Sequence, residues 1–146
     1  MSETHKIKMN EKHLQVILGN LLKNDPPNET AVYELKICKT KSMPFSQVKE
    51  HQIEALLQAK NGNLYHKISD SPIFAGHRTR FTTLKPFDCF NIYNAKAYIV
   101  ICYYKPRQKK EFIFIDVEDF VRFSKKSDRK SLTEEAARDI CVKILS

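Results

Sequence analysis

AYIVIC, residues 97–102, is apolar at every position except Tyr98. A strand with one face in water alternates apolar and polar residues, whereas a strand covered on both faces is a continuous apolar run. The segment therefore predicts a strand in the middle of a sheet, with other elements packed on both of its faces.

Strand-like segments flank this central run. FDCFNIY (87–93) precedes it, and Asn94-Ala95-Lys96 between the two predicts the turn of a β-hairpin. EFIFIDV (111–117) follows as another strand. We therefore expect 87–93 to pair with the central strand as a β-hairpin.

The N-terminal part of the chain predicts a helix and then a strand. Residues 11–23 carry one apolar stripe at helical spacing, and the prolines that follow end the helix. The stripe consists of Leu14, Ile17, Leu18, Leu21 and Leu22. AVYELKIC (31–38) follows as a strand in which apolar and polar side chains alternate.

The remaining segments complete an α/β pattern. We expect a helix from an N-cap at Ser46 to about Lys60, a strand at 64–68, a long functional loop at 69–86 and a helical turn near 118–123. Ser131 and Glu134 match a capping box, which predicts a last helix with apolar residues through Leu145 on one side. These elements predict a single domain over 1–146, a mixed β-sheet flanked by helices.

Charge and composition narrow the possible partners. Twenty-five Lys and Arg against 17 Asp and Glu give a net charge of +8 and a pI near 9.3, which favours a polyanion such as nucleic acid, although a merely soluble basic surface has the same charge. No apolar run is long enough to span a bilayer, and the charged N-terminus is unlike a secretory signal. We therefore expect an intracellular, cytoplasmic protein without membrane contact. The four cysteines form no CxxC pair, which favours buried free thiols over a zinc site.

Glu34 and Lys36 form the first candidate for chemistry. They are two residues apart on a predicted strand, so their side chains point to the same face. A carboxylate can hold a divalent metal that lowers the pKa of a bound water, and a neighbouring lysine can orient that water or stabilise charge on a phosphate. Exposed strands show such pairs by chance as well, so the pair alone is weak support.

The residues around this pair carry a family resemblance. YELKICKTKSMPFSQVKEHQIEALLQAKNG (33–62) resembles the segment of RecU-type Holliday-junction resolvases in which an ExK strand leads into a basic, proline-containing loop and a helix with His51-Gln52. Residues 97–123 look like the strand–turn–strand–short helix that closes the same fold. The resemblance implies a restriction-endonuclease-like fold of the PD-(D/E)xK superfamily. It also implies a Mg²⁺- or Mn²⁺-dependent DNA endonuclease that cuts branched DNA as a homodimer.

The chain departs from this family at the aspartate that usually precedes ExK. Asp25 lies in a proline turn, whereas Asp88 enters the predicted hairpin, in which Ile101 and Tyr103 occupy the Glu and Lys positions. We therefore expect a rearranged site in which Asp88, Glu34 and the carbonyl of Leu35 bind the metal. Catalysis is expected from Glu34, Lys36, Asp88 and Gln52, while Glu11 and Asp70 are weaker candidates for a further metal contact.

Basic side chains in loops and at helix ends predict the DNA contacts. They are Lys39, Lys41, His51, Arg78, Arg80, Lys105, Arg107, Lys109 and Lys110. Loop lysines and arginines bind phosphates without reading bases, which suits recognition by shape. Tyr103, Tyr104 and Phe81 are candidates for stacking on unpaired bases, although aromatic residues in strand-like runs more often belong to the core. Two alternatives remain open: a non-catalytic DNA-binding module on a degenerate nuclease fold, and an unrelated basic interaction protein.

Overall fold

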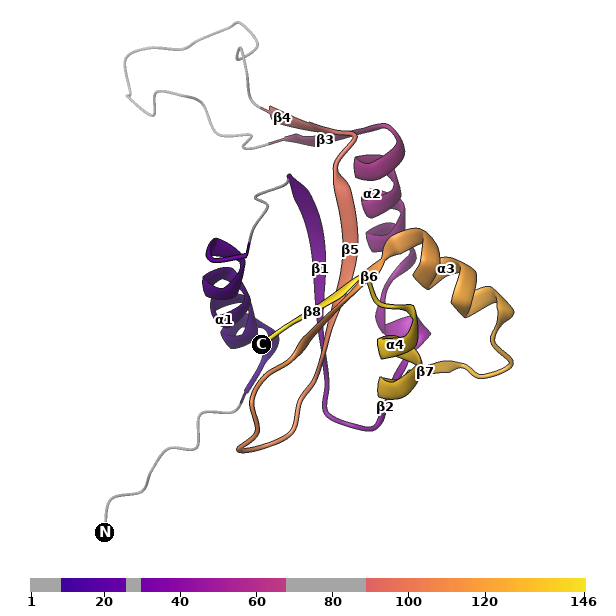
Figure 1. Ribbon diagram of the computed structural model, residues 1–146. Coiled ribbons are helices and arrows are strands. Elements are labelled where there is room, and N and C mark those ends of the chain that lie inside the picture. The colour runs from indigo at the N-terminus through magenta and orange to yellow at the C-terminus, as the bar shows by residue number, and fades with distance from the viewer. Residues whose placement is uncertain (1–8, 26–29, 68–88) are drawn as a thin grey trace, which may run out of the picture.

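A four-stranded mixed sheet with the strand order β1-β5-β6-β8 forms the centre of the fold (Figure 1). The computed structural model describes residues 9–25, 30–67 and 89–146. β5 (Lys96–Tyr103) runs parallel to β1 (Ala31–Cys38) and antiparallel to β6 (Phe112–Asp116), which pairs in turn with β8 (Lys143–Leu145). The predicted central position of 97–102 is therefore confirmed.

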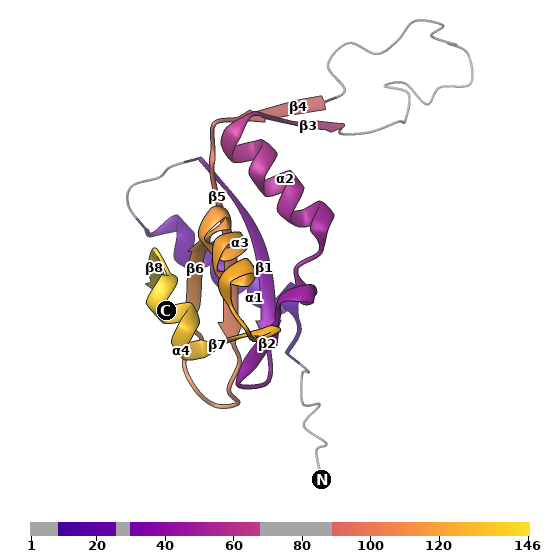
Figure 2. The ribbon, with the colours of Figure 1, turned by 90° about the vertical axis from the view of Figure 1, so that its right-hand side faces the viewer.

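Helices cover both faces of this sheet (Figure 2). α1 (Glu11–Lys23) packs Leu14 and Leu18 on one face. The opposite face is covered by α2 (Glu50–Asn61), α3 (Val117–Lys126) and α4 (Glu134–Ile140). The predicted fold class, a mixed sheet flanked by helices, is confirmed, and the arrangement is consistent with a restriction-endonuclease-like fold. No helix in the described ranges is long and apolar enough to cross a membrane.

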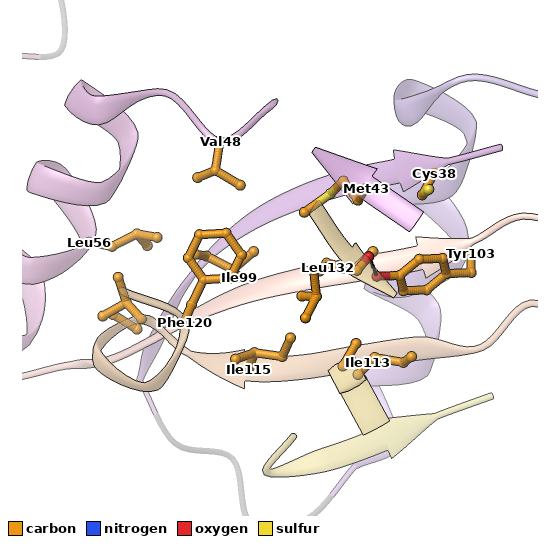
Figure 3. Close-up of a cluster of buried hydrophobic side chains, with 14 residues drawn as sticks. Cys38, Met43, Val48, Leu56, Ile99, Tyr103, Ile113, Ile115, Phe120 and Leu132 are labelled. Carbon is orange, nitrogen blue, oxygen red and sulfur yellow. Dashed lines mark hydrogen bonds between the residues drawn. The ribbon is translucent and has the colours of Figure 1, made fainter. Parts of the chain in front are cut away.

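The core on the α2 side joins segments between Val32 and Cys141 that are far apart in the sequence (Figure 3). Ile99 of β5 lies among residues from β6 and the covering helices, including Leu56 and Phe120. Tyr103 is also buried there, and its hydroxyl donates a hydrogen bond to the carbonyl of Leu132 at 2.8 Å. Of the two alternatives for Tyr103, the core position is therefore the one observed, and its ring is not available for stacking on bases.

The start of α2 differs from the prediction. Ser46 does not cap this helix, because Phe45–Gln47 forms a 3-10 helix after the short strand β2 (Ser42–Pro44). β2 pairs with β7 (Ser131–Thr133), which holds this segment extended. The helix begins only at Glu50, after Lys49. Long-range pairing therefore displaced the helix start that Ser46 indicated.

The predicted hairpin between 87–93 and the central strand is wrong. β4 (Cys89–Tyr93) pairs with β3 (Asn63–Lys67) in a separate two-stranded ribbon. Both edges of β5 are already occupied by β1 and β6, so no position beside β5 remains for β4. Asn94, with a φ of 49°, turns the chain from the ribbon into the central sheet.

The C-terminal segment also forms a strand that the helical pattern concealed. Thr133, not Ser131, caps α4, and its hydroxyl accepts from the backbone N–H of Ala136 at 3.2 Å. α4 ends at Ile140, and the chain then forms β8 along the free edge of β6. The predicted helix through Leu145 is therefore too long, because pairing with the edge of β6 satisfies the backbone of residues 143–145 in place of a continued helix. The turn expected near 118–123 is the longer α3.

Candidate active site

Glu34, Lys36 and Gln52 form a hydrogen-bonded cluster between β1 and α2. The ammonium of Lys36 lies 2.9 Å from Oε1 of Glu34, and Nε2 of Gln52 donates to the same oxygen at 2.7 Å. The other end of the Gln52 amide accepts from the backbone N–H of Lys49 at 2.9 Å. Both ends of the glutamine side chain are therefore held. We call these three residues the Glu34–Lys36–Gln52 cluster.

Local structure explains how these three side chains meet. Glu34 and Lys36 alternate with Leu35, which packs on the α1 side, so both point to the α2 side. Gln52 lies in the first turn of α2, next to its N-terminus. The hydrogen bond from Gln52 to Glu34 shows that Gln52 faces the strand that bears Glu34 and Lys36.

The cluster is only partly open to solvent. The Lys36 side chain is 9% exposed and the Glu34 side chain 26% exposed. Of the charged side chains in the described ranges, Lys36 is the buried one. A buried charge is tolerated when it is paired and hydrogen-bonded, which the contact with Glu34 provides. The cluster therefore presents a partly accessible carboxylate with a fixed cation beside it.

The donor set of the cluster is compatible with a divalent cation. Mg²⁺ in enzyme sites is often held by one or two carboxylates, with waters and substrate phosphates completing the coordination. Glu34 offers one such carboxylate at a solvent-accessible position. Among the residues that the structure describes, no three His, Cys, Asp or Glu side chains gather into a metal site. The cluster itself therefore offers the carboxylate of Glu34 to a cation.

The other predicted metal ligands do not join Glu34 in the described structure. Asp88 and Asp70 lie outside the described residues. Glu11 begins α1, which covers the face of the sheet opposite to Glu34. Asp25 forms an ion pair with Lys143, at 2.5 Å, which links the end of α1 to β8. The metal-binding role of Asp88 therefore stays a prediction, and that of Glu11 is disfavoured by its position.

A groove lies at the carboxyl ends of the parallel strands β1 and β5. Its volume is about 720 Å³, and its lining includes Lys39, Lys41, Tyr104, Lys105, Glu134 and Arg138. Lys39 and Lys41 are exposed and belong to the loop that follows β1. Three of the predicted DNA-binding lysines therefore share one cavity. We call it the strand-end groove.

The remaining predicted DNA contacts are spread over other surfaces. His51 is exposed in the first turn of α2, and Arg107 and Lys109 are exposed in the turn between β5 and β6. The ammonium of Lys110 lies 5.2 Å from the ring centroid of Tyr104. Arg78, Arg80 and Phe81 are outside the described residues. The turn that contains residues 105–110 leaves the carboxyl end of β5, whereas β4 precedes the other end of that strand.

Glu134 links two cations inside the strand-end groove. Lys105 donates to its Oε2 at 2.8 Å and Arg138 to its Oε1 at 2.9 Å. The hydrogen bond from Lys105 is the main reason why the pKa of Glu134 is lowered from its ordinary value, and the Arg138 hydrogen bond adds to it. The carboxylate is therefore held in its charged form in the folded protein.

We expect Glu134→Gln to make the stability of the protein less sensitive to acid. Because the folded-state pKa of Glu134 is lowered, its contribution is complete above the unfolded pKa of about 4.3 and is lost as pH falls through the folded value. Thermal melting from neutral to acidic pH measures this. Glu135→Gln, the exposed neighbour, is the control and should follow the parent. Identical acid profiles for Glu134→Gln and the parent would contradict the prediction.

Comparison of the chain with protein-family models, with curated proteins and with solved structures gave no match. One feature that the sequence reasoning missed is a pair of exposed tyrosines, Tyr65 and Tyr93, on the β3-β4 ribbon. Both lie in segments with strand-like alternation, but only the pairing of β3 with β4 brings them to one face.

Proposed function

We propose that this protein is a metal-dependent DNA endonuclease of the PD-(D/E)xK type, acting on branched DNA such as a Holliday junction. The observation that carries the proposal is the Glu34–Lys36–Gln52 cluster, in which a buried lysine and an oriented amide meet on one carboxylate oxygen. The strand-end groove adds Lys39 and Lys41, which follow Lys36 by three and five residues along the chain.

Each residue of the cluster has a role in hydrolysis of a phosphodiester. A bound Mg²⁺ or Mn²⁺ would supply an activated water and neutralise charge on the phosphate. Glu34 would hold the cation, together with the carbonyl of Leu35 and with Asp88 if that residue reaches the site. Lys36 stabilises negative charge that develops on the phosphate, and Gln52 keeps the carboxylate in one orientation.

A purely structural role explains the Glu34–Lys36–Gln52 cluster less well than a chemical role. Buried ion pairs contribute little net stability, because the cost of removing two charges from water offsets their attraction. Well-packed apolar residues stabilise such a position at least as well. Lys36 is nevertheless buried here, and the amide of Gln52 is hydrogen-bonded to its partner Glu34. This arrangement therefore favours a chemical role.

The proposed substrate follows from charge and from the shape of the basic surface. Lys39, Lys41 and Lys105 line one groove, which suits phosphate contacts. A junction has two equivalent strands to cut, so a homodimer with two active sites is proposed. The proposed substrate is DNA in the cytoplasm or nucleoid. Little dependence on base sequence is expected, because backbone contacts carry no sequence information.

A cleavage assay tests this function. The protein is incubated with Mg²⁺ and, separately, with EDTA, and the substrates are a four-way junction, a linear duplex of the same length and a single strand. We expect paired nicks in the junction with Mg²⁺ only. Equal cutting of all three substrates would replace the resolvase with a nonspecific nuclease. No cutting of any of them with either Mg²⁺ or Mn²⁺ would contradict the enzyme proposal.

A non-catalytic DNA-binding module is the second candidate. The observation in its favour is that the Glu34–Lys36–Gln52 cluster contains one carboxylate, and that no group of three metal-binding side chains occurs among the described residues. Such a protein would bind the junction tightly and cut nothing, whichever metal is supplied. The same assay, read by gel shift as well as by cleavage, separates it from the nuclease.

Charge reversal in the strand-end groove is expected to weaken DNA binding and reduce its salt dependence. Each phosphate contact contributes about 0.9 to the slope of log affinity against log salt, so Lys39→Glu and Lys41→Glu should each lower that slope by about one unit. Binding is measured by fluorescence anisotropy at several salt concentrations. Lys23→Glu, an exposed site at the end of α1, is the matched control. Equal slopes for Lys23→Glu and the groove variants would refute the assignment of the groove.

A further inference from the structure

The β3-β4 ribbon extends past the end of the central sheet (Figures 1 and 2). Tyr65 is 69% exposed and Tyr93 is 70% exposed, the highest values among the large hydrophobic side chains of the described ranges. The alternating residues Leu64 and Ile92 are partly buried, and both strands of the ribbon pack against α2. The ribbon is therefore anchored by one side and open on the other.

The strand register places both tyrosines on the open side. Tyr65 pairs with Asn91, and Asn63 pairs with Tyr93. Directly paired residues share a face, and diagonal neighbours lie roughly 7–8 Å apart. The amide of Asn91 also donates to that of Asn63 at 3.2 Å. We call Asn63, Tyr65, Asn91 and Tyr93 together the tyrosine face.

We propose that the tyrosine face binds unpaired nucleotides of a DNA substrate by stacking their bases on Tyr65 and Tyr93. The inference rests on the proposed function in one respect, namely that DNA is the ligand. Successive unpaired bases stack on exposed aromatic rings in single-strand-binding proteins, and this stacking tolerates any base sequence. The carboxamides of Asn63 and Asn91 add donors and acceptors that suit the edges of bases.

Charge argues for a nucleic acid over a protein surface as the occupant. The segments 63–67 and 89–96 contain Lys67 and Lys96 and no aspartate or glutamate. A polyanionic strand is therefore attracted to this ribbon, in keeping with the chain's net charge of +8. The carboxamides of Asn63 and Asn91 lie beside the two tyrosines, so the tyrosine face is less apolar than a surface that binds a second copy of the chain would be.

The ribbon is also close to the proposed catalytic residues. Lys96, which follows the turn out of β4, pairs with Ala31 at the start of β1. Glu34 is three residues further along that strand, a distance of roughly 10 Å at about 3.3 Å per residue. Lys39 lies beyond the other end of β1, in the strand-end groove. Duplex phosphates at the groove and unpaired bases on the ribbon would thus flank the Glu34–Lys36–Gln52 cluster.

Fluorescence anisotropy in EDTA tests the tyrosine face without cleavage. The probes are a labelled oligothymidine and a labelled hairpin duplex of matched length. Tyr65→Ala and Tyr93→Ala are each expected to weaken oligothymidine binding about tenfold, which corresponds to about 1.4 kcal/mol, with little change for the duplex. Tyr65→Phe and Tyr93→Phe keep the ring and should bind like the parent. Val16→Ala, an exposed apolar site on α1, is the control for a change outside the ribbon.

Several outcomes would overturn the inference. Unchanged oligothymidine affinity in both alanine variants excludes stacking on these rings. An equal loss in the phenylalanine variants shows that the hydroxyls, and not the rings, are needed. A shift from dimer to monomer in Tyr93→Ala, with single-strand affinity retained, assigns the surface to a second copy of the chain.

The nuclease proposal is judged separately by cleavage of a four-way junction with Mg²⁺. Junction cleavage without any effect of the tyrosine variants on oligothymidine binding overturns only the tyrosine face. A tyrosine effect without cleavage overturns only the nuclease. Absence of binding to every DNA probe overturns both.

Discussion

Lys36→Ala is expected to lower the rate of DNA cleavage by at least about 100-fold while leaving DNA affinity nearly unchanged. Lys36 is buried against Glu34 and lies on the covered face of β1, so it contributes little to the surface that phosphates reach first. Its ammonium is the fixed positive charge next to the proposed metal ligand. Removing one preorganised donor from an active site typically costs this much in rate. Single-turnover cleavage of a four-way junction and gel shift in EDTA measure the two quantities.

Two further variants separate chemistry from folding. Lys36→Met keeps much of the side-chain volume, so a loss of activity in a protein that melts like the parent identifies the charge as the cause. Lys23→Ala removes an exposed lysine from the end of α1 and should cut at the parent rate. Parent-level cleavage by Lys36→Ala would refute the catalytic role of the lysine, whatever the binding result.

Leu56→Ala is expected to lower the free energy of unfolding by about 2–5 kcal/mol. Leu56 is buried on α2 and packs in the same core as Ile99 and Phe120 (Figure 3). The truncation removes apolar contacts and leaves a cavity that the surrounding β-sheet cannot fully fill. Because α2 also carries Gln52, this contact stabilises the helix that completes the candidate site. Urea unfolding followed by circular dichroism measures the change.

Gln58→Ala is the matched control on the same helix. Its side chain is exposed, so the substitution should change the free energy of unfolding by no more than about 0.5 kcal/mol. Its backbone carbonyl, which accepts from Gly62 at the helix end, is unaffected by the replacement. Similar stabilities for Leu56→Ala and Gln58→Ala would show that α2 is not held to the sheet by this core.

Local periodicity predicted the elements whose own residues carry the pattern. The apolar stripe of 11–23 identified α1 within the observed bounds, and AVYELKIC gave β1. The continuous apolar run of β5 also predicted its central position, because it can only be covered on both faces. The same alternation put Glu34 and Lys36 on one face of β1.

One long-range relation in the site was also predictable, because it depends on two periodicities at once. The helical position of Gln52 and the strand position of Glu34 both point into the space between α2 and the sheet. Their hydrogen bond at 2.7 Å confirms the shared position. It does not test what the cluster does, which stays a proposal.

The sequence by itself determined which face of α1 and of β1 is buried, because a short stretch of residues suffices to show such periodicity. The tertiary structure alone decided which strands pair. β4 joins β3 because both edges of β5 are filled, and the last residues form β8 because β6 offers an open edge. Backbone hydrogen bonds between strands are nearly independent of side chains, so competition among distant segments selects the partner. That selection buried Tyr103 and brought Tyr65 and Tyr93 to one exposed face.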